Sequence, residues 1–335
     1  MADSLLAGVD IGGTKTAIVL SSHLPDTLTR SVFETKPKEG PAFAIDEIVK
    51  CLREALASSG AAGKPLQAIG VSCGGPLDPV AGVIQEPPNL PTWKDVSIKA
   101  ILASEFGVKC YLENDANAGA LAEWSFGAGV GTRNLVFLTM GTGLGAGLIV
   151  NGQLFRGTSN NAGEIGHVRL TRRGPAGYNK VGSVEGWASG AGMARLARIK
   201  ISQALARGHA TTLAGSDRDL SSLTARDVAI AADNGDVLAQ QIIRTTGKKL
   251  GEAMAILIDV VNPECIVVGG LAVRLKETLL RPARAVVKRE ALSGSADVCK
   301  IVCAALGETI GDVAALCVAV DGEKQEKATA SGPKL

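Results

Sequence analysis

Two glycine-rich turns, each flanked by apolar segments, constrain the fold of this 335-residue chain more than any other feature. They read Asp10-Ile-Gly-Gly-Thr-Lys15 and Thr139-Met-Gly-Thr-Gly-Leu-Gly-Ala-Gly147. The apolar runs on both sides of each turn predict two β-hairpins with the glycines at their tips. Glycine permits positive φ and lets backbone N–H groups approach an anion, and Thr14 and Thr142 add hydroxyl donors. Together the two tips indicate a site for a nucleotide phosphate chain and suggest phosphoryl transfer.

Two other phosphate-binding motifs compete with the hairpin interpretation. Gly141, Gly143 and Ala146 satisfy the dinucleotide fingerprint G-x-G-x-x-A, but that fingerprint must open a helix. The residues that follow, 148–154, form an apolar run that ends around Asn151-Gly152, which is a hairpin signal. Neither turn has the G-x-x-x-x-G-K-[ST] spacing of a P-loop. The hairpin interpretation is therefore preferred for both turns.

Length and composition favour an α/β protein of two lobes. The chain is longer than the length at which a single hydrophobic core stops growing, and its 46% hydrophobic content is enough for two cores. A net charge of +2 and 3% aromatic residues argue against a nucleic-acid surface. The apolar stretch 253–261 is too short to span a bilayer, and no signal-peptide pattern begins the chain, so a cytoplasmic location without membrane partners is expected. Seven scattered cysteines predict reduced thiols.

Apolar periodicity places polar motifs at the ends of predicted strands. Strands are predicted at 68–72, 109–112 and 265–268, and helices at 42–59, 98–105, 184–206, 225–233 and 236–261. The strand at 109–112 delivers Glu113-Asn-Asp115 to its carboxyl end, where open α/β sheets place their chemistry. The Pro- and Gly-rich loop 73–93 is long for a loop without regular structure, which favours a functional role.

Asp115 is the best candidate for a catalytic carboxylate. Phosphoryl transfer to a hydroxyl requires phosphate ligands, a metal and a group that accepts the hydroxyl proton. Asp115 directly follows a strand, and the small residues after it leave room for a substrate. An aspartate before an Ala-rich run is also a common helix N-cap, and taken alone the two interpretations have equal weight.

Five motifs, taken in order, resemble the ROK family (repressors, open reading frames and sugar kinases) over nearly the whole chain to about residue 320. They are Asp10-Ile-Gly-Gly-Thr-Lys15, Glu113-Asn-Asp-Ala-Asn117, Gly141-Thr-Gly-Leu-Gly145, Gly163-Glu-Ile-Gly-His167 and Glu185-Gly-Trp-Ala-Ser-Gly190. The resemblance implies an actin-like fold of two ribonuclease-H-like lobes with a cleft between them. A small lobe would comprise residues 1–116, completed by a helix within 308–320, and a large lobe residues 117–307. The polar segment 321–335 is expected to be a disordered tail.

The resemblance also implies an ATP- and Mg²⁺-dependent kinase for a hexose or amino sugar, working as a homodimer. Asp115 would be the base that takes the proton of the sugar 6-hydroxyl. Sugar contacts would come from Gly75, Asn89, Asn114, Asp115, Glu164, His167 and Glu185. The nucleotide would be bound by Asp10, Gly12, Gly13, Thr14, Lys15, Gly141, Thr142, Gly143, Gly269 and Gly270, with Asp10 also serving the magnesium ion.

One departure from the family pattern concerns zinc. Relatives with a zinc site carry a histidine and three cysteines in a loop of the type G-H…C-x-C-G-x-x-G-C-x-E. Between His167 and Glu185 this chain has no cysteine, and Ser183 stands at the last ligand position. No zinc site is therefore expected, which leaves His167 to bind substrate and Tyr178 as a candidate for holding the loop.

Several functions stay open at this stage. Glucose is the first expectation for the substrate, and an N-acetylhexosamine, fructose or allose is the alternative. A sugar-sensing regulator without catalysis would need an N-terminal DNA-binding domain, and the first phosphate turn already begins at Asp10. That alternative is disfavoured.

Overall fold

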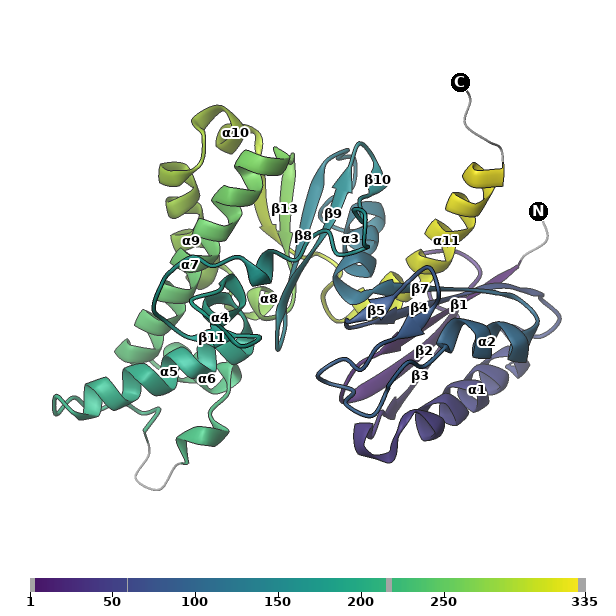
Figure 1. Cartoon of the computed structure of the whole chain (residues 1–335), viewed down its shortest axis with the longest axis horizontal. Helices are drawn as coiled ribbons and strands as arrows, with labels where there is room; N and C mark the ends of the chain where they lie inside the picture. The colour runs from purple at the N-terminus through teal and green to yellow at the C-terminus, as the bar shows by residue number, and fades with distance from the viewer. Residues whose placement is uncertain (1–3, 59, 215–218, 331–335) are drawn as a thin grey trace. The chain divides into compact units, whose positions relative to one another are not determined.

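The computed structural model describes residues 4–58, 60–214 and 219–330, which form two compact units. Unit 1 consists of the chain up to Phe126 together with the segment from Glu308 onward, and unit 2 consists of Gly127–Gly307. Each unit contains one five-stranded mixed sheet with helices packed on it (Figure 1). Among the described residues no helix is long and apolar enough to cross a membrane.

The sheet of unit 1 has the strand order β3-β2-β1-β4-β7, with antiparallel β3, β2 and β1 followed by parallel β4 and β7. Its strands are β1 (Leu5–Ile11), β2 (Lys15–Ser21), β3 (Thr29–Glu34), β4 (Leu66–Cys73) and β7 (Lys109–Asn114). The first glycine turn is the tip of the β1–β2 hairpin, as predicted. The segment 73–93, predicted to lack regular structure, contains the short hairpin β5 (Leu77–Asp78) and β6 (Val83–Ile84).

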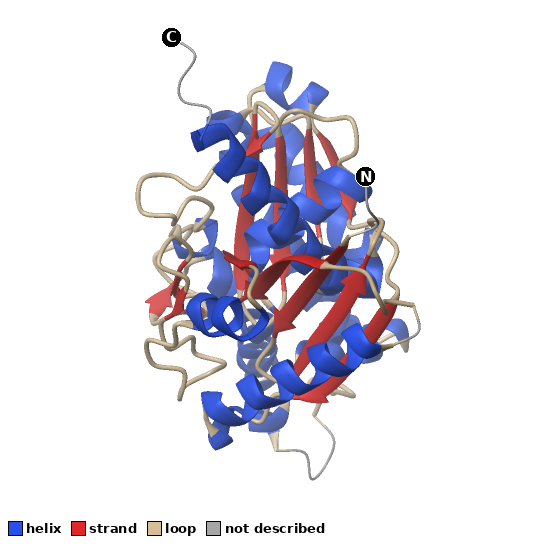
Figure 2. Ribbon diagram, turned by 90° about the vertical axis from the view of Figure 1, so that its right-hand side faces the viewer, coloured by secondary structure: helices blue, strands red, loops and turns tan. Residues whose placement is uncertain are grey.

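Helices cover both faces of this sheet (Figures 1 and 2). Helices α1 (Pro41–Ala57) and α2 (Ile98–Phe106) share one apolar core with strands β1 and β4. Side chains alternate along a strand, so Leu6, Gly8 and Asp10 of β1 face the opposite side. On that side lie α3 (Asp115–Phe126) and α11 (Ile310–Ala330).

Two glycines allow α11 to lie directly on the sheet. Gly8 and Gly70 are register partners on β1 and β4. A Cβ on Gly70 would lie 2.0 Å from the carbonyl oxygen of Ala315, and a Cβ on Gly8 would lie 3.0 Å from the Cβ of Ala315. Side chains at these two positions would push the helix away. The glycine pair therefore fixes where α11 crosses the sheet.

The structure corrects the expected disordered tail and the expected lobe boundary, and the first correction concerns helix α11. It continues to Ala330, so the described part of the segment predicted as a disordered tail is helical, while residues 331–335 lie outside the described residues. The polar end is held by the Lys109–Glu326 ion pair and a 2.6 Å hydrogen bond from Gln67 to Glu323. The boundary of unit 1 falls after Phe126, so that α3 belongs to unit 1 and not to the large lobe from residue 117.

Unit 2 has the strand order β10-β9-β8-β13-β14. Its sheet strands are β8 (Leu135–Met140), β9 (Leu144–Val150), β10 (Gln153–Leu154), β13 (Cys265–Val268) and β14 (Lys300–Cys303), and a separate small hairpin comprises β11 (Ala176–Gly177) and β12 (Lys180–Val181). Strands β8 and β9 pair antiparallel around the second glycine turn. The hairpin prediction for that turn is confirmed, and a helix does not follow it.

The helices of unit 2 pack on one another and on the sheet around a single apolar core. They are α4 (Val184–Ala188), α5 (Gly190–Leu205), α6 (Ala225–Asp233), α7 (Val237–Val261), α8 (Leu271–Leu275), α9 (Glu277–Glu290) and α10 (Ser293–Val298). The segment 184–206, which was predicted to contain helices, forms α4 and α5, and Ser189 separates them by capping α5 through the amide of Gly192. This break turns the start of α5 toward the second glycine turn.

Gly70→Ala should lower the free energy of unfolding by at least about 2 kcal/mol, because the new methyl group meets backbone of α11 and not a movable side chain. Gly294→Ala in α10 is the control, since a Cβ there has nothing within 4 Å. The control should change stability by less than about 1 kcal/mol, in the stabilising direction. Urea denaturation of both variants measures the difference, and equal stabilities would contradict the tight crossing.

Candidate active site

The carboxyl ends of β1, β4 and β7 bring the predicted residues of unit 1 together. Asp10 pairs in register with Ser72, and Ser72 with Glu113 on the next strand. Asn114 ends β7 and Asp115 begins α3. Since parallel strands end at one edge of the sheet, Asp10 and the Asn114-Asp115 pair share that edge.

Asp10 lies against the start of α11. It is half-buried, and a Cβ on Gly311 would lie 2.3 Å from its Oδ2 atom. Burial raises the pKa of Asp10 to about 6, with smaller increases from the nearby charges of Asp115 and Asp312, while a hydrogen bond with the Ser72 side chain opposes the rise. Asp10 therefore carries a negative charge that the ligand-free protein leaves partly uncompensated.

Hydrogen bonds fix the backbone of the first glycine turn, and the side chains at its tip are exposed. The Gly12 amide donates to the carbonyl of Lys15, and Thr35 Oγ1 donates to the carbonyl of Gly12 at 2.7 Å. Thr14 and Lys15 are exposed at the tip. The backbone is thus fixed by hydrogen bonds that leave the side chains at the tip available to a ligand.

Asn89 joins this turn to the residues around Asp115. A Cβ on Gly13 would lie 2.8 Å from the Cβ of Asn89, and a Cβ on Gly74 would lie 3.8 Å from its amide group and 3.9 Å from Asp115 Oδ2. The structure therefore places the predicted sugar contact Asn89 between the phosphate turn and the candidate base. Gly75 is adjacent, with its Cβ position 3.4 Å from Asn114 Nδ2.

Asp115 has an exposed side chain at the first position of α3. Its Oδ1 accepts the amide of the next residue, Ala116, at 2.8 Å, and Asn114 Oδ1 accepts the same amide at 2.9 Å. Because Asn114 directly precedes α3, it is Asn114 and not Asp115 that makes the N-cap contact. Desolvation by the surrounding protein raises the pKa of Asp115, and hydrogen bonds from the amides of Ala116 and of Asp115 itself oppose the rise. The Asp115 carboxylate itself stays exposed beside this cap.

Two supporting contacts were missed by the sequence analysis. Buried Glu113 accepts hydrogen bonds at 2.9 Å from the Asn114 amide and from Asn117 Nδ2, which fixes the strand-to-helix junction before Asp115. Buried Asp312 of α11 pairs with Arg30 of β3 at 2.6 Å. Glu113 and Asn117 belong to a motif in the sequence, whereas nothing local could have linked Arg30 to Asp312.

In unit 2 the second glycine turn contacts the start of α5. The amide of Gly190 donates to the carbonyl of Gly141 at 2.8 Å, and the amide of Ala191 donates to that of Thr142 at 3.2 Å. Gly270 has φ of +62°, and a Cβ there would lie 2.3 Å from the carbonyl oxygen of Met140. Only glycine permits this approach of the β13–α8 connection to the turn.

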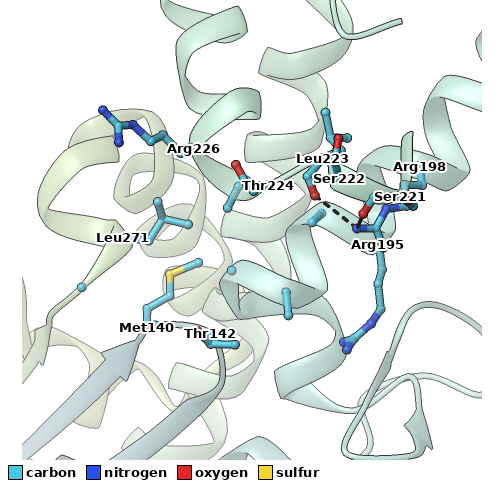
Figure 3. Close-up of a pocket in the computed structure, with 16 residues that line it drawn as sticks. Met140, Thr142, Arg195, Arg198, Ser221, Ser222, Leu223, Thr224, Arg226 and Leu271 are labelled. Carbon is cyan, nitrogen blue, oxygen red and sulfur yellow. Dashed lines mark hydrogen bonds between the residues drawn. The ribbon is translucent and has the colours of Figure 1, made fainter. Parts of the chain in front are cut away.

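A cavity of about 620 Å³ opens beside this turn (Figure 3). Of the predicted nucleotide residues of unit 2, Gly141, Thr142 and Gly270 line it. The rest of the lining was not predicted from the sequence: Met140, Gly190, Ala191, Ala194, Arg195, Arg198, Ser221, Ser222, Leu223, Thr224, Ala225, Arg226 and Leu271. The predicted residues Gly143 and Gly269 are not part of this lining. A Cβ on Gly143 would lie 2.8 Å from Glu185 Oε2, and the amide of Gly269 donates to the carbonyl of Leu138.

The predicted sugar residues of unit 2 surround the loop between 163 and 185. His167 Nε2 lies 3.7 Å from Glu164 Oε2, and the His167 ring packs edge-on against Tyr178 with centroids 5.0 Å apart. Glu185 Oε2 accepts the amide of Leu144 at 3.3 Å. Glu185 is thus tied to the second glycine turn, and His167 to the loop.

Hydrogen bonds order the loop from His167 to Glu185. Strands β11 and β12 pair through a turn with positive φ at Tyr178 and Asn179. Buried Ser183 caps α4 by accepting the amide of Gly186 at 3.1 Å. Trp187 Nε1 donates to Thr171 Oγ1 at 2.8 Å. At the position where relatives with a zinc site carry the last ligand, the Ser183 hydroxyl therefore caps a helix.

No group of three or more His, Cys, Asp or Glu side chains suited to a metal ion occurs in the described parts of the chain. The seven cysteines, all within the described residues, form no disulfide bond. For Mg²⁺ the residues present do fit, because the ion is commonly held by one or two carboxylates together with water and substrate phosphates. Asp10, an incompletely compensated carboxylate beside the first phosphate turn, could supply that ligand.

Asp10→Asn should stabilise the ligand-free protein above pH 6. The folded-state pKa of Asp10 is raised from 3.8 to about 6, so folding favours the protonated form and wild-type stability falls as pH rises through this window. At about 1.4 kcal/mol per pKa unit, the gain is up to about 3 kcal/mol at pH 8 and vanishes below pH 4. Denaturation in EDTA at both pH values measures it.

Asp312→Asn is the matched control, because it removes a carboxylate that has an ion-pair partner, Arg30. It should lower stability where Asp10→Asn raises it. An Asp10→Asn variant that is less stable than wild type at pH 8 would contradict the uncompensated charge.

Ser183→Ala should lower the free energy of unfolding by about 1 kcal/mol, the usual cost of a lost N-cap. Ser202→Ala, an exposed position within α5, should change it by less than about 0.5 kcal/mol. A zinc-selective chelator should leave the melting temperature unchanged. One zinc ion per purified chain, found by elemental analysis, would show that metal and not this cap orders the loop.

The chain is similar to known proteins over most of its length. The family model described as ROK family matches residues 6–321. A glucokinase of Halalkalibacterium halodurans is 32% identical over 314 residues, which cover 93% of this chain and 93% of that protein. A xylose repressor of Caldicellulosiruptor bescii is 26% identical over 285 residues, covering 85% of this chain and 70% of the repressor.

Solved structures share the fold. The crystal structure of a ROK family glucokinase from Streptomyces griseus in complex with glucose and AMPPNP matches with a TM-score of 0.76 at 29% identity, over 95% of this chain and 100% of that one. The actin-like, ribonuclease-H-like fold expected from the sequence is thereby confirmed. Because the family model spans nearly all of the sequence, this chain belongs to the ROK family.

Proposed function

We propose that this chain is an ATP-dependent sugar kinase that phosphorylates a hexose, with glucose as the first substrate and its 6-hydroxyl as the acceptor. The observation that carries the proposal is the exposed Asp115 carboxylate at the end of β7, with Asn89 and Gly74 beside it. The Halalkalibacterium and Streptomyces glucokinases support the assignment to sugar kinases. The choice of glucose rests on those relatives.

Asp115 is the proposed general base. As the sugar 6-oxygen forms its bond to the γ-phosphorus, the bond from that phosphorus to the β–γ bridging oxygen breaks and ADP leaves. The hydroxyl proton passes to the Asp115 carboxylate. A raised pKa suits this task, because a base whose pKa lies nearer to the working pH holds the proton better. Glu113 and Asn117 keep the junction rigid while the proton moves.

Asn89 and Asn114 are the proposed sugar contacts of unit 1, and Glu164, His167 and Glu185 those of unit 2. Amide, imidazole and carboxylate groups can donate to or accept from the vicinal hydroxyls of a hexose. The Gly75 backbone lies against Asn114 and leaves space that a side chain would fill. The hydrogen bonds within the loop from His167 to Glu185 would hold these unit 2 residues in place.

Each unit is proposed to contribute its own nucleotide-binding residues: the first glycine turn in unit 1, and the second glycine turn with the adjacent cavity in unit 2. Gly12, Gly13, Thr14 and Lys15 offer backbone and side-chain donors to the phosphates, while Gly141, Thr142 and Gly270 line the cavity that would take the nucleoside. Asp10 would help to hold Mg²⁺. When bound, the ion neutralises charge on the β- and γ-phosphates.

A purely sugar-sensing role, like that of the xylose repressor relative, is the competing function. Such a role would need the sugar contacts but not an accessible carboxylate at the acceptor hydroxyl. Within the kinase class, an N-acetylhexosamine, fructose or allose is the alternative substrate. Measured activity separates these possibilities.

Asp115→Asn should lower turnover by roughly 10²- to 10⁴-fold and leave sugar affinity within a few-fold, because the amide keeps the shape but cannot accept the proton. ADP release with ATP and Mg²⁺ across a hexose and hexosamine panel gives turnover, and calorimetry gives affinity. Asp95→Asn is the control, since Asp95 is exposed with φ of +51°, which asparagine tolerates. Near wild-type turnover in Asp115→Asn would remove the base assignment, and no ADP release with any sugar would favour the sensing role.

A further inference from the structure

One wall of the unit 2 cavity is a short segment that has little regular structure of its own. It consists of the single 3₁₀ turn η3 (Leu220–Ser222) followed by Leu223 and Thr224, and Ser221, Ser222, Leu223 and Thr224 line the cavity. Its two ends are capped by Asp219, which accepts the amide of Ser221 at 2.8 Å, and by Thr224, which opens α6. A wall this short needs support from a neighbouring element.

Arg198 of α5 supplies that support through three hydrogen bonds to backbone carbonyls. Its Nε donates to Leu220 at 2.8 Å, and its Nη2 donates to Ser221 at 2.8 Å and to Leu223 at 3.2 Å. Figure 3 shows the guanidinium against Ser221 and Leu223. The planar fork of a guanidinium suits such parallel acceptors, which a single ammonium group cannot reproduce.

The same helix is attached to the phosphate turn at its other end. Amides of Gly190 and Ala191, at the start of α5, donate to the carbonyls of Gly141 and Thr142. Residues Ala191, Ala194, Arg195 and Arg198 line the cavity, and their spacing of i, i+3, i+4 and i+7 forms one stripe along α5. Helix α5 therefore sets the distance between the glycine turn and the η3 wall.

We propose that Arg198 is a positioning residue for the nucleotide, which fixes the wall of the cavity that meets the nucleoside and leaves phosphate binding to the glycine turns. The inference rests on the proposed function, since it takes ATP as the ligand of this cavity. A positioning role has a different consequence from a direct contact between Arg198 and phosphate. If the wall is no longer fixed, binding affinity should fall for every ligand that carries the nucleoside, whether or not that ligand is charged.

The test compares two probes by calorimetry, AMPPNP with Mg²⁺ and uncharged adenosine, on wild-type and variant protein. Arg198→Ala should weaken both probes by the same factor, about tenfold, which corresponds to about 1.4 kcal/mol. Arg198→Lys keeps the positive charge but not the planar guanidinium, so its affinity for both probes should remain below that of wild type. A loss confined to AMPPNP, or full recovery in Arg198→Lys, would overturn the positioning role in favour of a phosphate contact.

Arg284→Ala is the matched control for general destabilisation. Arg284 is also half-buried and also donates from Nε and Nη2 to a backbone carbonyl, that of Ile301 in β14, away from the cavity lining. It should keep adenosine affinity within about twofold. Equal losses in Arg284→Ala and Arg198→Ala would overturn the inference, whereas wild-type protein that binds neither probe would overturn the proposed function itself.

Discussion

Close approach of backbone to backbone at a few glycines is the constraint on which the rest of this structure depends. In unit 1, α11 can lie on the sheet because Gly8 and Gly70 have no side chains, and its Gly311 then reaches Asp10. In unit 2, Gly190 and Gly270 bring α5 and the β13–α8 connection onto the second glycine turn. Larger residues at these points would move whole elements, and the polar groups that those elements carry would move with them.

The same packing leaves charge at the site incompletely compensated. Asp312 has Arg30 as an ion-pair partner. Asp10 has the Ser72 hydroxyl and a smaller favourable effect from Lys15, which burial and the neighbouring charges of Asp115 and Asp312 outweigh. A protein selected for stability alone would not keep that arrangement. A cationic ligand would compensate the negative charge of Asp10, which is the physical reason to connect this position with a metal ion and phosphates. Stability and proposed activity thus make opposite demands on one side chain.

What the sequence could predict followed from local signals. The glycine turns, the strand before Asp115 and most helices depend on patterns within about twenty residues, and the structure has them where expected. The extension of α11 to Ala330 could not be predicted, because polar contacts with Gln67 and Lys109, far away in sequence, hold a segment that has no apolar face. The sequence left Asp115 open between a helix cap and a base, because the adjacent Asn114 can cap the same helix, and the structure has Asn114 in the N-cap position.

Phosphorus NMR of a reaction mixture tests the central claim, transfer of the γ-phosphoryl group of ATP to a sugar hydroxyl, most directly. With wild-type protein, Mg²⁺, ATP and glucose, loss of the γ-phosphate signal should be matched by an equal gain of a hexose 6-phosphate signal, with ADP as the other product. Release of inorganic phosphate alone, or ATP that stays intact with every sugar supplied, would contradict the account.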